Sequence, residues 1–315
     1  MDDLVKRICC PICFSKNTLK INQIDINNDV KLELFVLRTY NNELLNYLKK
    51  KNYEYKILMC KECNTYYQES LMPESMTHLF YNKGRSTFKS FSKALESSSK
   101  YTRNLTNAKN YKKKTLSEIL NLLKSHKKKL GKTIRAIEFG SGWGFFALAL
   151  KQNNIDVESI EMSEIRRNFQ EEILGLKVFN SLDKLKKKKY DIITSFQVIE
   201  HLNYPIQMLE NLYGKLSEGG VMRIEVPTTL GIKKNIDKDF YRFVGKSSLQ
   251  PLEHLQAFTN DTFKKIAEKL DCKYIFQPIP TNIYNRIKQK NFRSIFNKKE
   301  SIGRVTFVKR SRTFN

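Results

Sequence analysis

The sequence contains no long hydrophobic run. Its longest uninterrupted apolar stretch, Phe145 to Leu150, has six residues, whereas a transmembrane helix needs about 20. The first residues include Asp2 and Asp3 and lack the apolar core of a secretory signal. We therefore expect a chain without a membrane span, located in the cytoplasm.

Acidic residues are scarce beside basic ones. The chain has 32 Asp and Glu against 57 Lys and Arg, a formal net charge of +25, and such a field attracts polyanions, including RNA. The lysines are nevertheless spread along the chain, with clusters at Lys112–Lys114, Lys127–Lys129 and Lys186–Lys189. No aromatic-interleaved RNA-binding motif accompanies them. We interpret the charge mainly as solvated surface and keep nucleic acid as an alternative partner.

Cysteine is also sparse, with six residues, but four of them form two Cys-x-x-Cys pairs. In a reducing cytosol such pairs are more often metal ligands than disulfides. Four thiolates suit a closed, tetrahedral, structural zinc site. The predicted zinc ligands are Cys10, Cys13, Cys60 and Cys63.

The residues around these pairs give mixed signals. Asn64, directly after the second pair, tolerates the left-handed backbone that such turns need. Phe14 occupies the place where a zinc knuckle usually has Gly, and the two pairs are far apart in the sequence. Cys9 adjoins the site as an alternative ligand, and we expect Cys272 in the core.

Strand-like and helix-like segments alternate from about residue 115 onward, which predicts an α/β doubly wound, Rossmann-like sheet. A first helix begins near Thr115, which together with Glu118 fits a capping box. The other expected helices are 145–151, 164–174, 205–216 and 261–270. The expected strands are 134–139, 156–160, 176–179, 190–196, 221–226, 273–277 and 303–309.

The N-terminal part of the chain lacks this alternation. We expect strands at Lys31–Leu37 and Tyr55–Met59, in the region that holds the cysteine pairs. The predicted organisation is a zinc-binding region at 1–70, a partly helical connector at 71–109 and a catalytic domain at 110–315.

A glycine-rich turn follows the first strand of the predicted sheet. In the segment AIEFGSGWGFF the strand ends at Glu138, and Gly140, Gly142 and Gly144 alternate before a helix begins. Glycines at the carboxyl end of a first strand let the backbone approach a ligand closely. The segment therefore predicts a binding site for a nucleotide-containing molecule.

An acidic residue sharpens this prediction. Glu161 ends the second predicted strand, about twenty residues after the glycines. A carboxylate at this place accepts hydrogen bonds from both ribose hydroxyls of a nucleoside cofactor. Because Glu138 and Glu161 suit a cationic cofactor better than a pyrophosphate, a dehydrogenase is the weaker interpretation.

Four segments together resemble the motifs of class I S-adenosylmethionine-dependent methyltransferases: EFGSGWG, IEMSE, GLKVFNSLDKL and YDIITSFQVIEHLNYP. The resemblance covers about residues 110–280 and is to the branch with a Glu-His pair after the fourth strand. It implies S-adenosylmethionine as cofactor, bound by the glycine turn and by residues that follow strands two, three and four. The implied cofactor-binding residues are Glu138, Gly140, Ser141, Gly142, Gly144, Glu161, Met162, Ser181, Leu182, Phe196 and Gln197.

Within that set the resemblance assigns separate parts of the cofactor. Glu138 and the glycine turn lie under the methionine part, and Glu161 holds the ribose. Ser181 and Leu182 border the adenine, and Phe196 and Gln197 flank the sulfonium.

The candidate catalytic residue is His254. It stands in PLEHLQAFT, where related methyltransferases carry a His shortly before Phe-Thr or Phe-Ser, and an imidazole has the right pKa to take a hydroxyl proton near neutrality. A structural histidine that anchors this loop is the alternative. We expect Glu200 and His201 to brace the loop over the cofactor, and Tyr241 and Arg242 to reach the substrate.

The N-terminal cysteine pairs resemble those of deoxysugar C-methyltransferases and other methyltransferases of bacterial surface-glycan pathways. Glu253 and His254 are similar to a Glu-His pair of the sugar C-methyltransferases, but Pro251 and Leu252 stand where those enzymes have a preceding His. We therefore predict O-methylation of a small polar acceptor, such as a sugar or glycan precursor. The alternatives are an RNA or protein methyltransferase and a non-catalytic scaffold with the same fold.

Overall fold

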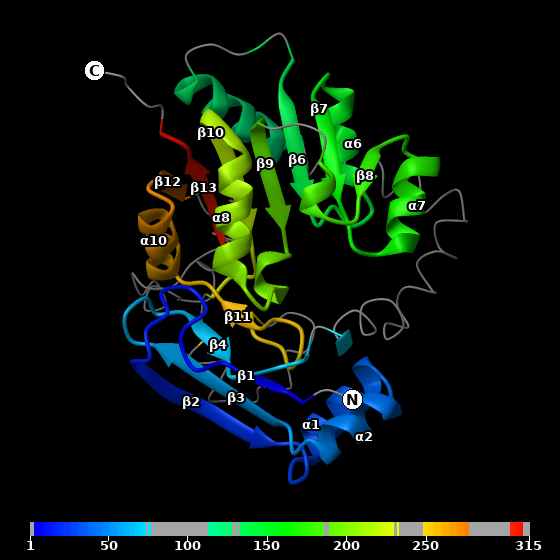
Figure 1. Cartoon of the computed structure of the whole chain (residues 1–315), viewed down its shortest axis with the longest axis vertical. Coiled ribbons are helices and arrows are strands. Elements are labelled where there is room, and N and C mark those ends of the chain that lie inside the picture. The colour runs from blue at the N-terminus through cyan, green and yellow to red at the C-terminus, as the bar shows by residue number, and fades with distance from the viewer. Residues whose placement is uncertain are drawn as a thin grey trace, which may run out of the picture.

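The computed structural model describes residues 3–73, 75–76, 113–127, 131, 133–185, 189–229, 232, 248–276 and 303–310. Its largest element is a seven-stranded sheet with the order β12-β13-β10-β9-β6-β7-β8 (Figure 1). The strands are β6 (Arg135–Phe139), β7 (Asp156–Ile160), β8 (Lys177–Phe179), β9 (Tyr190–Phe196), β10 (Leu216–Glu225), β12 (Lys273–Phe276) and β13 (Arg304–Val308).

The order of the strands reverses between β6 and β9. The chain runs outward from β6 to β7 and β8 and then returns to β9 on the other side of β6, with all of these pairs parallel. β10 continues the parallel set, whereas β13 pairs antiparallel with both β10 and β12. Such a reversal opens a crevice at the carboxyl ends of β6 and β9, where α/β proteins bind their ligands.

Helices cover both faces of this sheet, as the doubly wound prediction requires. The helix over residues 113–126 and α6 (Phe145–Gln152) share one buried cluster on one face. On the other face α8 (Pro205–Lys215) and α10 (Asn260–Lys269) share a second cluster. Two short 3-10 turns, η1 (Leu182–Lys184) and η2 (Ile199–His201), follow β8 and β9, and α7 (Glu164–Glu172) follows β7.

A smaller, four-stranded antiparallel sheet lies beside the carboxyl edge of the large one (Figure 1). Its order is β11-β4-β3-β2, and its edge strand β11 (Gln256–Ala257) comes from the C-terminal half of the chain. The other strands are β2 (Thr18–Asp25), β3 (Glu54–Cys60) and β4 (Tyr66–Gln68); β1 (Val5–Lys6) and β5 (Ser70–Leu71) form a separate pair.

The predicted strand at Lys31–Leu37 is wrong, because this segment lies in helix α1 (Val30–Thr39). The Asp29 side chain accepts a hydrogen bond from the Leu32 amide and caps the helix. Helix α1 packs against α2 (Asn42–Lys50) and buries Leu32, Phe35 and Val36. This spacing of three and four residues is that of one helical face.

Two further expectations differ in detail. Residues 113–126 are helical, so Thr115 lies within the first helix and does not cap it. Strand β10 begins at Leu216, five residues before the expected start, and an irregularity in its pairing precedes Val221. Gly219 has φ +68°, and an added Cβ would lie 2.7 Å from the His126 carbonyl oxygen, so this close approach requires glycine.

Several expectations concern residues outside the described ones. These are the connector at 77–109, Lys112, Lys128–Lys129, Lys186–Lys188, Tyr241, Arg242 and the segment after residue 310. Of the lysine clusters, Lys113, Lys114, Lys127 and Lys189 are described, and Lys127 forms an ion pair with Asp191. Across the described part of the chain, helices are too short or too polar to cross a membrane.

Candidate functional site

The glycine turn joins β6 to α6 and is held by hydrogen bonds to the end of β7 and to α7. Its three glycines have φ of +70°, +57° and +75°, a left-handed backbone that glycine adopts at low cost. The Gly140 and Ser141 amides donate to the Ile160 carbonyl oxygen at 2.8 and 3.0 Å. The Gln170 amide group donates to Ser141 Oγ and to the Gly142 carbonyl oxygen at 2.9 and 2.8 Å. Gln170 is a site residue that the sequence analysis did not identify.

The space around the three glycines differs. A Cβ on Gly140 would lie 2.3 Å from Val198 Cγ2, and one on Gly144 would lie 2.6 Å from Gln170 Cγ. A Cβ on Gly142 would meet no atom of the described residues within 4 Å. Gly140 and Gly144 are therefore required by packing, whereas Gly142 borders open space.

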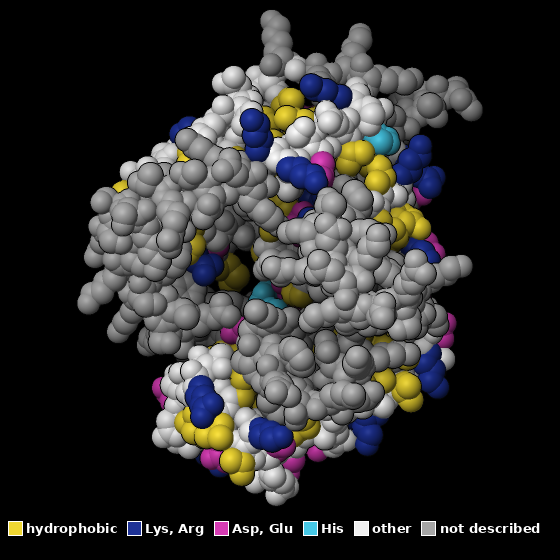
Figure 2. All heavy atoms as spheres, turned by 180° about the vertical axis from the view of Figure 1, so that it is seen from behind, with side chains coloured by type: hydrophobic (Ala, Val, Ile, Leu, Met, Phe, Trp, Pro, Cys, Tyr) yellow, Lys and Arg dark blue, Asp and Glu magenta, His cyan; other side chains and the backbone are white. Residues whose placement is uncertain are grey.

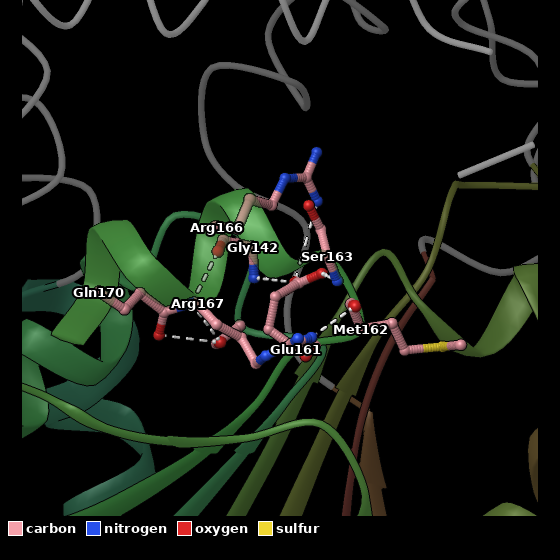
Figure 3. A network of polar contacts seen from close by, with 8 residues as sticks. Gly142, Glu161, Met162, Ser163, Arg166, Arg167 and Gln170 are labelled. Carbon is pink, nitrogen blue, oxygen red and sulfur yellow. Dashed lines mark hydrogen bonds and ion pairs between the residues drawn. The ribbon is translucent and has the colours of Figure 1, made fainter. Parts of the chain in front are cut away.

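The carboxylate of Glu161 lies directly against the glycine turn (Figure 3). Its Oε2 accepts a hydrogen bond from the Gly142 amide at 2.8 Å, and its Oε1 accepts one from the Ser163 amide at 2.9 Å. The side chain is 7% exposed. A guanidinium nitrogen of Arg166 lies 3.9 Å from Oε2. Glu161 is thus oriented by backbone donors at the carboxyl end of β7, as the sequence predicts.

Glu138 has a different environment. Its buried carboxylate accepts a hydrogen bond from the Ala147 amide at 2.6 Å. This amide belongs to the first turn of α6, where backbone N–H groups lack partners and the helix dipole is positive. The Glu138 charge therefore occupies the helix terminus at which a dinucleotide-binding fold holds its pyrophosphate.

Three other expected cofactor residues, Met162, Ser181 and Leu182, follow the ends of β7 and β8. The Glu161 amide donates to the Phe179 carbonyl oxygen at 2.9 Å, so β7 and the start of the Ser181–Leu182 turn stay in register. Leu182 is partly buried, and the side chain of Met162 points away from the Glu161 carboxylate (Figure 3). Met162 is 58% exposed.

Phe196 and Gln197 end the neighbouring strand β9. The Phe196 ring packs edge-on against Phe146, with centroids 4.9 Å apart. Gln197 is exposed and has φ +57°. Its backbone N–H donates to the Glu225 carbonyl oxygen at 2.7 Å. The exposed side chain of Gln197 therefore stands at the crevice between β6 and β9.

His254 lies beside η2, which follows Gln197 and Val198 directly. Its ring is half-buried and edge-on to the ring of His201, with centroids 4.8 Å apart. Glu200 is fully buried next to them, and burial raises the pKa of its carboxyl group to about 8. The structure therefore brings together the candidate catalytic histidine and the Glu-His pair, residues more than fifty positions apart in the sequence.

The segment around His254 is held by the N-terminal region. Gln68, which is buried, donates its amide hydrogens to the carbonyl oxygens of Gln250 and His254 at 2.6 and 2.9 Å. Arg7 reaches the loop after η2 and donates to the Asn203 carbonyl oxygen and to Gln256 Oε1 at 2.9 and 2.8 Å. No sequence signal points to Gln68 or Arg7, because their partners lie about 180 to 250 residues away.

The four paired cysteines converge at one end of the small sheet. Cys10 Sγ lies 3.5 Å from Cys63 Sγ, and Cys13 Sγ lies 3.4 Å from Cys60 Sγ; none is in a disulfide. All four sulfurs lie within 4.8 Å of one another, and the set does not include Cys9. Tetrahedral zinc with Zn–S bonds of about 2.3 Å places sulfurs about 3.8 Å apart, so this donor set fits zinc.

The backbone around the cysteines has the geometry of two turns of the same kind. Phe14 and Asn64, each directly after a pair, have φ of +64° and +54°. Asn64 thus adopts the expected left-handed conformation, and Phe14 adopts it without being glycine. Burial raises the pKa of the Cys13 thiol to about 12, so a cation bound there would displace a proton.

Comparison with known proteins agrees with this geometry. A family model described as a methyltransferase domain matches residues 107–276, more than half of the chain. No curated protein is significantly similar to the chain in sequence.

Several solved structures are similar. One is the plantazolicin methyltransferase BpumL in complex with SAH (TM-score 0.45, 15% identity, covering 74% of this chain and 94% of that chain). Another is a SAM-dependent methyltransferase from Archaeoglobus fulgidus (0.39, 18%, 62% and 93%). A third is the CurJ carbon methyltransferase (0.39, 13%, 58% and 51%), of which the chain spans about half.

Proposed function

This chain belongs to the methyltransferase-domain family, and we propose that it transfers a methyl group from S-adenosylmethionine to a hydroxyl group of a small polar acceptor. A sugar or a glycan precursor is the acceptor class that we favour. The observation that carries the proposal is the Glu161 carboxylate, fixed at the carboxyl end of β7 and opposite the open space at Gly142.

The hydrogen bonds of Glu161 leave room for a nucleoside. A carboxylate accepts about four hydrogen bonds, two on each oxygen. The Gly142 amide occupies one of these positions on Oε2, and the Ser163 amide occupies one on Oε1. Each oxygen thus keeps one position for a ribose hydroxyl. Because the two backbone donors also fix the plane of the carboxylate, this acceptor pair is preorganised for the two neighbouring hydroxyls of adenosine.

Glu138 favours a cationic donor molecule over a dinucleotide. Its carboxylate already accepts a hydrogen bond from the Ala147 amide at the start of α6. A pyrophosphate at this helix terminus would compete with that carboxylate and be repelled by it. A sulfonium and an ammonium group carry positive charge, which a carboxylate stabilises.

We place His254 next to the methyl acceptor, and Phe196 and Gln197 next to the sulfonium of the methyl donor. S-adenosylmethionine, when bound, supplies an electrophilic methyl group for an in-line displacement. The chain has to align the acceptor oxygen and help its proton to leave. His254 is suited to this task because its ring is half-buried beside η2, directly after the end of β9.

A small acceptor agrees better with the surface than a polyanion does. Figure 2 shows the Lys and Arg side chains of the described residues scattered over one face and interspersed with acidic ones. Nucleic-acid-binding surfaces instead gather basic side chains on one face. We propose residues 110–315 as the catalytic domain and residues 1–70 as a zinc-binding region that supports the His254 segment.

Calorimetry with S-adenosylhomocysteine tests the donor site. We expect the purified chain to bind it with micromolar affinity, and Glu161→Gln to weaken binding by about tenfold or more. Hydrogen bonds to a charged group contribute about 1.5–3 kcal/mol, and 1.4 kcal/mol is a factor of ten.

Glu164→Gln is the matched control, since Glu164 is exposed in the first turn of α7. Equal affinities of the two variants, or tight binding of NAD by the wild type, would overturn the proposed donor. Methyl transfer from labelled S-adenosylmethionine is then compared on nucleotide-linked sugars and on RNA. Labelling of RNA alone would reject the favoured acceptor class.

We further propose that Cys10, Cys13, Cys60 and Cys63 bind one structural zinc ion. The site is connected to the catalytic domain, because the Thr262 hydroxyl donates to the Cys63 carbonyl oxygen at 3.2 Å in the first turn of α10. Zinc here would supply no reaction step. It would stabilise the small sheet, in which β4 pairs with β11.

About one equivalent of zinc per chain should copurify, and Cys60→Ser should lower the melting temperature by roughly 5 °C or more. A change of 1 kcal/mol shifts the melting temperature of a domain of this size by about 2–4 °C, and structural zinc contributes more. Cys9→Ser is the control, because it removes a neighbouring thiol outside the four-sulfur set. Zinc retained by Cys60→Ser and lost from Cys9→Ser would contradict the assignment.

A further inference from the structure

A second group of metal-type ligands lies at the carboxyl edge of the large sheet. Glu200 and His201 belong to η2, and His254 lies two residues before the start of β11. One ligand atom of each of these three side chains lies within 4.8 Å of the others. The group does not include the cysteines. The turn η2, which carries Glu200 and His201, directly follows Val198, and Val198 borders Gly140 closely enough to clash with an added Cβ there.

The Glu200 side chain is unusual within this group. It is 0% exposed, and among the described residues no other residue donates a hydrogen bond to either carboxylate oxygen; the Glu200 backbone amide is the one donor that approaches it. His201 Nε2 lies 3.7 Å from Oε1. An ionised carboxylate buried in this way costs several kcal/mol unless a cation or hydrogen bonds compensate it.

The backbone holds the two segments of the group together without help from these side chains. The Leu255 amide donates to the Glu200 carbonyl oxygen at 2.8 Å. The Gln256 side chain donates to the carbonyl oxygens of Ile199 and Leu202, both at 2.9 Å. The three ligand groups are therefore brought together in advance, which is what a metal site requires.

We propose that Glu200, His201 and His254 bind a divalent first-row transition-metal ion. Two imidazole nitrogens and one carboxylate oxygen form a ligand set that suits such ions and leaves coordination positions open. Bonds of about 2.1 Å place neighbouring ligand atoms roughly 3 to 3.5 Å apart. The separation of 3.7 Å between Glu200 Oε1 and His201 Nε2 is already close to this value.

The open positions connect the ion to catalysis, and this consequence rests on the proposed function. His201 and His254 are both only partly buried. An acceptor hydroxyl bound to the ion there would lose its proton to solvent water more readily, because the ion stabilises the resulting oxyanion. The oxygen then bonds to the methyl carbon as the methyl–sulfur bond breaks. His254 assists loss of the acceptor proton as a ligand of the ion.

Binding of Mn²⁺ to the purified full-length chain tests the site without any acceptor. Mn²⁺ prefers oxygen and nitrogen ligands to thiolates, so it reports on this group while zinc stays on the cysteines. After dialysis against a weak chelator, the electron paramagnetic resonance signal of free Mn²⁺ should show about one bound equivalent per chain. Glu200→Gln, which keeps the shape of the side chain, should weaken binding by tenfold or more.

His126→Gln is the matched control, because His126 lies on the helix 113–126, outside the group, and forms hydrogen bonds with Ser125 and Leu122. Circular dichroism of each variant verifies that it is folded. Mn²⁺ affinity that is the same in the wild type and in both Glu200→Gln and His201→Ala would overturn the proposal. Affinity for S-adenosylhomocysteine, measured on the same samples, separates this failure from a failure of the proposed function.

Discussion

Gly142→Leu is expected to abolish binding of S-adenosylhomocysteine. Gly142 borders open space that faces the Glu161 carboxylate, and its amide is one of the two donors that orient this carboxylate. A leucine side chain would project into the volume that the ribose and the methionine part need. Its Cβ would meet none of the described atoms within 4 Å. Calorimetry should therefore detect no binding by a folded variant.

Backbone strain is the competing explanation, and the chain offers a control for it. Gly142 has φ +57°, where a side chain costs roughly 1–2 kcal/mol. Gly175 has φ +60°, and a Cβ there would contact only the flexible end of Lys151 at 3.3 Å. Gly175→Leu should lose similar stability and keep its affinity. Equal loss of affinity in both variants would assign the effect to strain and refute the proposed place of the cofactor.

His254→Ala is expected to lower turnover by about a hundredfold or more and to leave the affinity for S-adenosylhomocysteine unchanged. Assistance to proton loss acts mainly in the transition state and contributes about 10²- to 10⁴-fold. His254 contacts the His201 ring and is remote in sequence from the glycine turn and Glu161. Turnover is measured as transfer of a labelled methyl group to nucleotide-linked sugars, with His126→Ala as the control.

Glu200→Gln distinguishes a metal ligand from a lone general base. If His254 acts through a bound ion, this substitution lowers turnover as His254→Ala does, and added Mn²⁺ does not restore it. If His254 acts alone, Glu200→Gln stays near the wild-type rate. Full activity of His254→Ala would remove the acceptor side of the proposed function.

The catalytic core was predictable because its signals are local. The end of β6, the glycine turn and the start of α6 lie within one short segment, and strand–turn–helix patterning places Glu161 at the end of β7. The helices and strands of the large sheet agree with the expected ones within a few residues. Most of these elements bury a face that their own spacing of apolar residues encodes, whereas α7 buries only Gln170.

The N-terminal region was harder to predict for the same reason. The segment Lys31–Leu37 consists of residues that suit a strand as well as a helix. The capping interaction of Asp29 and the packing of α1 on α2 decide in favour of the helix. Short apolar segments are ambiguous when tertiary contacts select their conformation.

The grouping of Glu200, His201 and His254 was beyond the sequence analysis. The sequence assigned the first two to bracing a loop and the third to catalysis. They meet because β11 returns to the small sheet, where Gln68 donates to the His254 carbonyl oxygen and Arg7 donates to the side-chain oxygen of Gln256. Contacts across about 180 to 250 residues have no signature in a single sequence.

Because β11 belongs to the small sheet, local unfolding and the evolution of the two regions should be linked. The amides of the segment that carries His254 share their hydrogen-bonded network with strands of the N-terminal half. The Gln68 amide donates to the Leu255 carbonyl oxygen, and the Leu255 amide donates to the Glu200 carbonyl oxygen. In native-state hydrogen exchange, the protection of these two amides should therefore be lost in a single cooperative event, since segments joined by such hydrogen bonds open as one unit. By the same reasoning, an exchange of the first seventy residues between relatives would replace the pairing partners of the segment that carries His254. The N-terminal region and this segment should therefore be inherited together, although Gln68 and His254 are 186 residues apart.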